Sequence, residues 1–143
     1  MPCITLPYDP AVGPILTIGI TAPSSLAAPG SSPPTYKFIK GLVDSGCSNI
    51  AIAPATAKAA GLIAVSKTQV VSTTQTVTAD VHLGDLALPY HARGATQHFY
   101  FKDVRFTDFL HPNPNFEALI GRDVLGMGTL FLNGHTNQFT FCW

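Results

Sequence analysis

Residues 38–49 read FIKGLVDSGCSN, and this stretch decides the fold that the sequence predicts. Its apolar, β-branched first half predicts a buried strand that ends at Asp44. Ser45 and Gly46 follow as turn residues, and glycine allows a close approach of the backbone. A carboxylate at the end of a buried strand is costly unless it has partners. The pattern therefore indicates a functional site at Asp44.

A second stretch, residues 116–125, reads FEALIGRDVL. Together, a strand that ends in Asp-Ser-Gly and a later Ala-Leu-Ile-Gly-Arg-Asp-Val-Leu resemble the retropepsin-like aspartic proteases, the single-domain relatives of retroviral protease. The termini, PCITL at 2–6 and QFTFC at 138–142, resemble the terminal strands that interleave in dimers of that family. The resemblance implies a mostly β, small closed-barrel-like acid-protease domain with one or two short helices, homodimeric.

The composition fits one such domain over residues 1–143. Of its residues, 46% are hydrophobic and only 11% are charged. A chain of this length and hydrophobic content is able to bury one hydrophobic core. A formal net charge of zero and the lack of Lys/Arg clusters argue against nucleic acid or a membrane surface as partner. The chain as given shows no signal peptide and no membrane-spanning run, so the cytoplasm is the default expectation.

Cysteines and histidines predict neither a metal nor another cofactor. The five histidines form no HExxH-type pair, and three cysteines lack the paired spacing of a zinc site. Cys47 as a nucleophile needs a histidine that nothing local supplies. We expect three reduced, partly buried thiols, although Cys3 and Cys142 are able to approach, within a chain or across a dimer, if the terminal strands lie side by side.

Several regular elements are predicted before and after the Asp44 turn. We expect strands at 4–6, 15–20, 50–53 and 62–65, a long exposed loop at 23–34, a helix at 54–60, a short helix at 122–126, and a closing hairpin at 130–133 and 138–141. Residues 89–98 predict an extra loop within a second hairpin, and the aromatic run 99–101 on its far side indicates core.

The longest β-like region runs from residue 67 to 88, with a polar centre at 72–75 that predicts a hairpin tip. The resemblance implies that this hairpin is the flap that covers bound peptide. No glycine lies between Gly61 and Gly84, so the glycine-rich tip of the retroviral members is missing. An ordinary surface hairpin remains the alternative.

The resemblance implies catalysis by two aspartates that share one proton. Only Asp44 is followed by Ser/Thr-Gly, so the mechanism requires a symmetric homodimer with one Asp44 from each subunit. The resemblance implies that the hydroxyl of Ser45 forms a hydrogen bond across the dimer. The alternative is that Ser45 is an ordinary turn residue. The N–H of Gly46 approaches a carboxylate oxygen.

Two further residues are expected to be structural. The resemblance implies that Gly121 passes behind the turn, where close backbone packing requires glycine, and that Arg122 is structural rather than catalytic. Retroviral members usually carry an acid where Ser48 stands here, so the partner of Arg122 is open, with Asp123 as a local candidate. Ser48 and Asn49 are candidate donors to bound peptide.

The predicted activity is aspartic endopeptidase cleavage of an extended peptide or protein substrate with bulky apolar residues near the cut. The candidate substrate-binding residues lie after the turn, on the hairpin and on the later strand: Ser48, Asn49, Ile52, Val71, Thr73, Thr74, Gln75, Val77 and Ile120. Two alternatives stay open. One is a non-catalytic dimeric peptide-binding or assembly module with the same fold, and the other is an unrelated β-barrel that binds small apolar ligands.

Overall fold

The computed structural model describes residues 1–71, 74–109, 111 and 113–143. No helix in this part of the chain is long and apolar enough to cross a membrane. The elements in chain order are β1 (Cys3–Pro7), β2 (Ile15–Thr21), the 3-10 turn η1 (Ser24–Leu26), β3 (Lys37–Val43), β4 (Ala51–Ile52), α1 (Pro54–Ala59), β5 (Ile63–Val71), β6 (Thr76–Ala92), β7 (Ala95–Asp108), β8 (Ala118–Ile120), α2 (Arg122–Leu125), β9 (Thr129–Asn133) and β10 (Gln138–Cys142).

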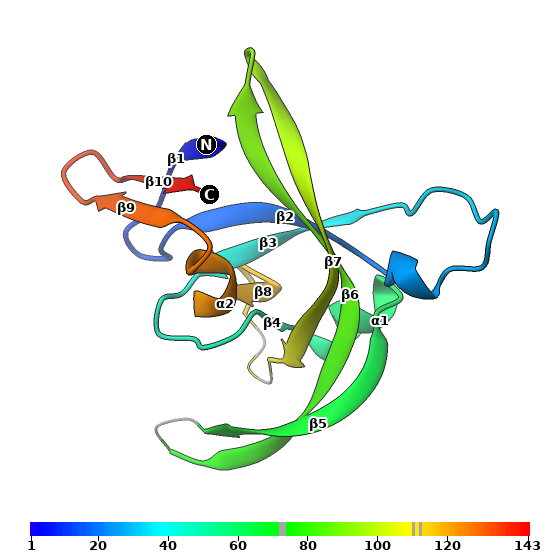
Figure 1. Ribbon diagram of the computed structural model, residues 1–143. Coiled ribbons are helices and arrows are strands. Elements are labelled where there is room, and N and C mark those ends of the chain that lie inside the picture. The colour runs from blue at the N-terminus through cyan, green and yellow to red at the C-terminus, as the bar shows by residue number, and fades with distance from the viewer. Residues whose placement is uncertain (72–73, 110, 112) are drawn as a thin grey trace.

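The main sheet closes into a small barrel (Figure 1). Its strands follow the order β2-β3-β8-β4-β7-β6, and β6 pairs again with β2, while β5 extends the sheet beyond β6. Alternate residues of these strands fill the barrel with Leu, Ile and Phe side chains that are almost fully buried. The predicted mostly β, barrel-like domain with two short helices is therefore confirmed.

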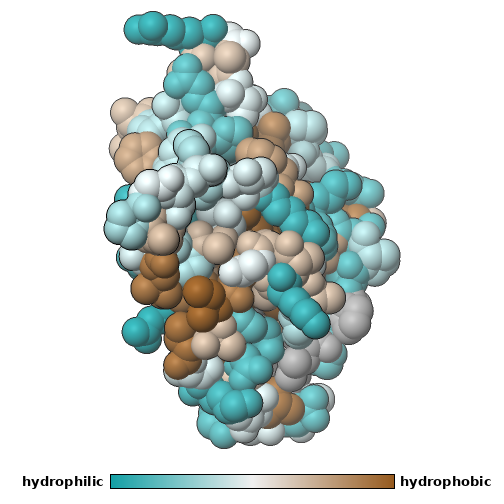
Figure 2. Space-filling view, turned by 90° about the vertical axis from the view of Figure 1, so that its right-hand side faces the viewer, coloured by the Kyte–Doolittle hydropathy of each residue, from teal (hydrophilic) through white to brown (hydrophobic). Residues whose placement is uncertain are grey.

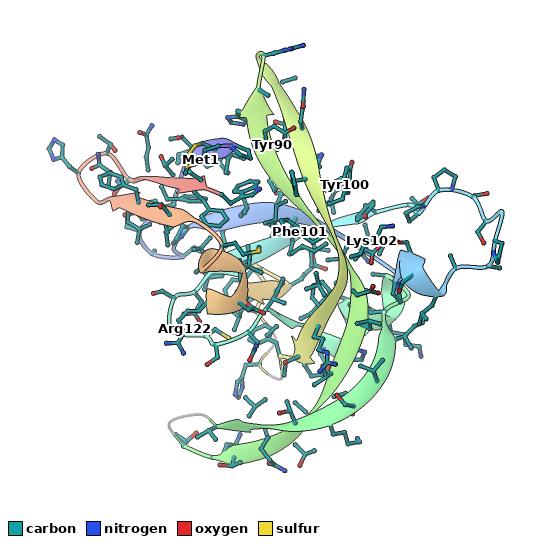
Figure 3. All side chains as sticks on the ribbon, in the orientation of Figure 1. Met1, Tyr90, Tyr100, Phe101, Lys102 and Arg122 are labelled. Atoms are coloured by element: carbon teal, nitrogen blue, oxygen red, sulfur yellow. A yellow bond between two sulfur atoms is a disulfide. The ribbon has the colours of Figure 1, made fainter. Side chains whose placement is uncertain are left out.

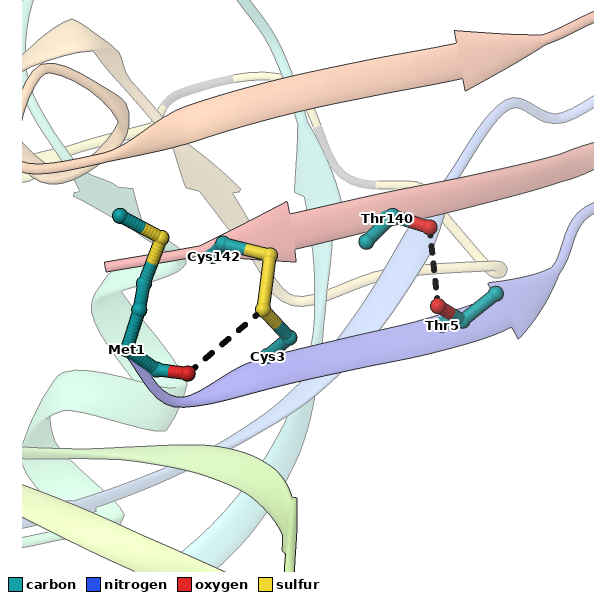
Figure 4. Close-up of a disulfide and its surroundings, with 5 residues drawn as sticks. All are labelled: Met1, Cys3, Thr5, Thr140 and Cys142. Carbon is teal, nitrogen blue, oxygen red and sulfur yellow. Dashed lines mark hydrogen bonds between the residues drawn. A yellow bond between two sulfur atoms is a disulfide. The ribbon is translucent and has the colours of Figure 1, made fainter.

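The two chain ends form a second, three-stranded sheet in the order β1-β10-β9. Cys3 lies opposite Cys142 in the antiparallel β1–β10 pair, and the two residues are joined by a disulfide (Figure 4). The expectation of three reduced thiols was therefore wrong: the terminal strands lie side by side within one chain, which brings the two sulfurs together. The closing hairpin of β9 and β10 is confirmed.

Two long hairpins share strand β6 and extend from opposite ends of the barrel (Figure 1). The β5–β6 hairpin pairs up to Val71 and Thr76, on either side of the predicted tip at 72–75, of which residues 72 and 73 lie outside the described residues. The expected loop at 89–98 was wrong, because β6 and β7 continue to Ala92 and Ala95. Arg93 and Gly94 turn the chain there with φ of 52° and 76°, as a tight hairpin turn requires.

The far end of the β6–β7 hairpin is more exposed than the sequence suggests. Phe99 and Tyr100 are about half exposed, so the expectation that run 99–101 belongs to the core holds only for the partly buried Phe101. Tyr100 contacts Tyr36 with ring centroids 5.1 Å apart. Figure 2 shows the hydrophilic hairpin tip projecting above the body, with hydrophobic side chains gathered lower on the face that carries η1.

Candidate active site

The Asp44 turn begins where β3 leaves the barrel. The backbone N–H of Asp44 donates to the carbonyl of Ile120 on the parallel strand β8, with an N–O distance of 3.0 Å. The N–H of Gly46 donates to Oδ1 of Asp44 at 2.9 Å, and the N–H of Cys47 donates to the Asp44 carbonyl at 3.2 Å. Asp44 is half-buried, whereas Ser45 and Gly46 are exposed. The carboxylate is thus held by its own turn and open on one side.

Helix α2 clamps the segment that follows the turn. The N–H groups of Arg122 and Asp123 donate to the carbonyls of Cys47 and Ser48, at 2.9 and 3.2 Å. In return, Oδ2 of Asp123 accepts the N–H of Ile50 at 2.8 Å. These contacts supply partners for backbone groups that a loop and a helix start otherwise leave unpaired. The turn therefore rests on a rigid support.

Gly121 sits where this support comes closest to the chain after the turn. A Cβ atom at Gly121 would lie 2.4 Å from the carbonyl oxygen of Asn49 and 2.8 Å from its nitrogen. Arg122, beside the loop after β3 in Figure 3, donates from Nη2 to Oγ of Ser48 at 3.0 Å. Ser48 is thus a partner of Arg122, and the carboxylate of Asp123 binds backbone N–H groups.

A cleft of about 490 Å³ opens between the turn and the β5–β6 hairpin. Gly46 lines it, and Asp44 stands directly behind Gly46 through their hydrogen bond. One wall comes from the turn, one from the hairpin and one from the ends of β4, β7 and β8. The lining residues are Gly46, Cys47, Ser48, Asn49, Ala51, Thr68, Gln69, Val70, Val71, Gln75, Val77, Thr107, Asp108, Phe109, His111 and Leu119.

The cleft brings together some of the candidate substrate-binding residues and leaves out others. Ser48, Asn49, Val71, Gln75 and Val77 all line it. Thr74 is described but is not part of the lining, and Thr73 lies outside the described residues.

Ile52 and Ile120 do not line the cleft, so their assignment as pocket walls is corrected. Both side chains are fully buried in the core. Neighbouring residues of a strand point to opposite faces, so Ala51 and Leu119 face the cleft instead. The side chains of β4 and β8 alternate between the two faces of the sheet, but the sequence does not show which face points into the barrel.

Sequence reasoning also missed a polar pair at the edge of the cleft. Nε2 of His82 on β6 lies 2.8 Å from Oδ1 of Asp108 at the end of β7, and their side chains are only 13% and 10% exposed. Asp108 lines the cleft. A buried carboxylate requires such a partner. His82 and Asp108 are 26 residues apart in the chain, so no local sequence pattern indicates that they pair. No group of His, Cys, Asp or Glu within the described residues is arranged to hold a metal ion.

Cys47 is the cysteine outside the disulfide, and it lines the cleft. Burial raises the pKa of its thiol, and the nearby carboxylates of Asp44 and Asp123 raise it further, against the lowering effects of a backbone hydrogen bond at Asn49 and of Arg122. The Sγ of Cys47 lies 3.0 Å from the carbonyl oxygen of Asn49, to which it donates. A raised pKa favours the neutral thiol, so Cys47 is a hydrogen-bond donor here and a poor nucleophile.

Alkylation of Cys47 is therefore expected to be slow at neutral pH. Because the thiolate is the reactive form, the iodoacetamide rate should keep rising above about pH 9, where an ordinary thiol is already largely ionised. Mass spectrometry of the non-reduced protein measures this rate, and the unfolded chain gives the reference. A rate that levels off near pH 8 in the folded protein would contradict the raised pKa.

The fold is that of the retropepsin-like aspartic proteases. The structure matches the crystal structure of a retropepsin-like aspartic protease from Rickettsia conorii with a TM-score of 0.53 and 13% sequence identity, covering 97% of this chain and 89% of that chain. No protein-family model and no curated protein matches the sequence. At this identity the likeness establishes the fold alone.

Proposed function

We propose that the protein is an aspartic endopeptidase that works as a homodimer. The observation that carries this proposal is the position of Asp44, on a clamped turn at the end of the cleft in a retropepsin fold. One chain offers one such carboxylate. A second Asp44, related by a two-fold axis, completes the dyad.

In the dyad, one carboxylate is ionised and takes a proton from the attacking water. The other is protonated and donates to the carbonyl oxygen of the scissile bond. Two carboxylates this close share one proton, because both cannot be charged together. The Gly46 N–H at 2.9 Å stabilises the negative charge on Oδ1 and orients the carboxylate. Cleavage is therefore expected to be fastest at acidic pH.

The cleft suits an extended peptide. The β5–β6 hairpin acts as the flap that closes over it, and Val71 and Val77 supply apolar contacts from that side. Leu119 supplies the matching contact from β8, next to the turn. Extended peptides bind in such clefts through main-chain hydrogen bonds, and alternate side chains enter pockets. Substrates with bulky apolar residues beside the cut are the class that these walls favour.

A mixed peptide library incubated with purified protein across acidic and neutral pH tests this function. The expected result is cleavage at apolar sites, fastest at acidic pH, with a rate per subunit that rises with protein concentration while the dimer is weak. Mass spectrometry identifies the cut sites. If the protein is shown to be a dimer and cleaves nothing at any pH, the proposed function is wrong, and a non-catalytic peptide-binding module takes its place.

A further inference from the structure

We propose that residues 33–36, Pro-Pro-Thr-Tyr, are a docking site for a partner of the WW class, a small domain whose aromatic groove binds proline-rich segments. The inference goes beyond the proposed peptidase activity and does not depend on it. The site lies in the loop between β2 and β3, which contributes no lining residue to the cleft.

The backbone of this segment is extended because its covalent structure allows little else. In each of the two prolines the ring fixes φ at about −65°. Ser32 and Pro33 both precede a proline, which disfavours helical backbone at these two residues. The chain makes no turn between residues 31 and 36. The segment is therefore close to the polyproline II conformation that aromatic grooves recognise, and it loses little conformational entropy on binding.

The position of the tyrosine identifies the class of groove. A polyproline II helix has about three residues per turn, so Pro33 and Tyr36 lie on the same edge, roughly 9 Å apart. A partner that contacts this edge meets two proline rings and then a phenol ring, the order of side chains that WW domains of the Pro-Pro-x-Tyr class bind. The loop prolines, at positions 23, 29, 33 and 34, include no pair with the Pro-x-x-Pro spacing of SH3 ligands.

The segment is open to such a partner. Pro33, Pro34 and Thr35 are exposed, and none of them forms a hydrogen bond with another described residue. Residues 22–36 include no charged side chain, so the contacts on offer are the rings and the backbone carbonyls. The β2–β3 loop extends from the barrel on the side away from the terminal sheet and from the tip of the β5–β6 hairpin (Figure 1). A domain bound there leaves the cleft open.

Tyr36 is the part of the site that must move. Its Cβ atom would lie 3.3 Å from a Cβ at Gly19, so close packing on Gly19 fixes the point where the loop joins β3. The ring of Tyr36 is half-buried and contacts Tyr100, with centroids 5.1 Å apart and planes tilted by 49°. Tyr100 is itself 57% exposed. Rotation of the Tyr36 side chain breaks this aromatic contact and frees the ring for the pocket of the partner.

Titration of a folded WW domain of the Pro-Pro-x-Tyr class into the Asp44→Asn protein, followed by calorimetry, tests this site. We expect saturable binding with a Kd below about 100 μM. Pro33→Ala, Pro34→Ala and Tyr36→Ala, each added to this background, should weaken binding at least about ten-fold, because each removes a ring from the groove. Thr35→Ala is the matched control and should bind like the parent, since the third edge of the helix faces away from the groove.

The contact between the two tyrosines provides a second measurement. Tyr100→Ala should tighten binding by about three-fold or more, because Tyr36 then loses no aromatic contact when it enters the pocket. The same WW domain with a groove aromatic residue replaced by alanine should not bind. Thermal midpoints of all variants, measured beside the parent, separate lost docking from lost structure.

Three results would overturn the proposal. They are a Kd above about 100 μM for the parent, Pro33→Ala and Tyr36→Ala proteins that bind like the parent, and a Tyr100→Ala protein that binds no more tightly. The titration uses chains that lack Asp44 and needs no cleavage. A protein that docks the WW domain but cleaves no peptide would therefore refute only the proposed function, and one that cleaves peptide but does not dock would refute only this site.

Discussion

Replacing Asp44 by Asn is expected to lower kcat/KM by about 10⁴-fold or more, because the dyad loses the group that takes and gives the proton. The amide oxygen of Asn still accepts the hydrogen bond from the N–H of Gly46, which spans 2.9 Å in the wild type. The turn and the dimer should therefore persist. Peptide cleavage and the thermal midpoint, measured on the same preparation, separate lost chemistry from lost structure.

Asp9→Asn is the matched control for this substitution. Oδ1 of Asp9 also accepts a backbone N–H two residues on, from Ala11 at 2.9 Å, but Asp9 does not line the cleft. The Asp9→Asn variant should cleave peptide at the wild-type rate. A pure Asp44→Asn protein that retains even a hundredth of the wild-type rate would remove Asp44 from the mechanism.

Replacing Gly121 by Ala is expected to destabilise the fold by about 3 kcal/mol or more, since overpacking against backbone cannot relax by rotating a side chain. The new Cβ would stand 2.4 Å from the carbonyl oxygen of Asn49. Gly121 has φ of −85°, which any residue adopts, so the cost is purely steric. The displaced Asn49 segment carries the turn with it, and activity should fall even well below the melting temperature. Urea unfolding monitored by circular dichroism measures the change.

Gly134→Ala provides the comparison for Gly121→Ala. A Cβ at Gly134 meets nothing closer than 4.0 Å. The free energy of unfolding of the Gly134→Ala variant should differ from that of the wild type by less than about 0.5 kcal/mol. Equal stability of the two variants would show that α2 and the turn are not packed as tightly as the structure has them.

The Asp44 turn and the strand before α2 were predictable because their chemistry is local. Each of these features is recognised from a few adjacent residues. One is an apolar strand that ends in Asp-Ser-Gly, and the other is Ile120-Gly121-Arg122 at the start of a helix. The pairing of β5 with β6 was predictable for the same reason, since a polar break interrupts two runs of Thr and Val. The catalytic and binding roles of these residues stay predictions.

Features that depend on distant pairing were not predictable in the same way. The apolar run at residues 118–120 suits either face of a strand, so its inward residue was taken for the cleft wall in place of Leu119. The Cys3–Cys142 bridge joins residues 139 positions apart and depends on the sheet that the termini build. The turn and polar residues of the stretch 89–98 suggested a loop, yet the two positive-φ residues at 93–94 allow the strands to continue to a tight turn.

The measurement that tests the central claim most directly is cleavage by mixtures of wild-type and Asp44→Asn chains at fixed total concentration, after subunit exchange. A dyad shared by two chains predicts about a quarter of the wild-type rate in an equal mixture, because only wild-type pairs have both aspartates. A rate of about half, in proportion to the wild-type chains, means that each chain acts alone and contradicts the shared dyad.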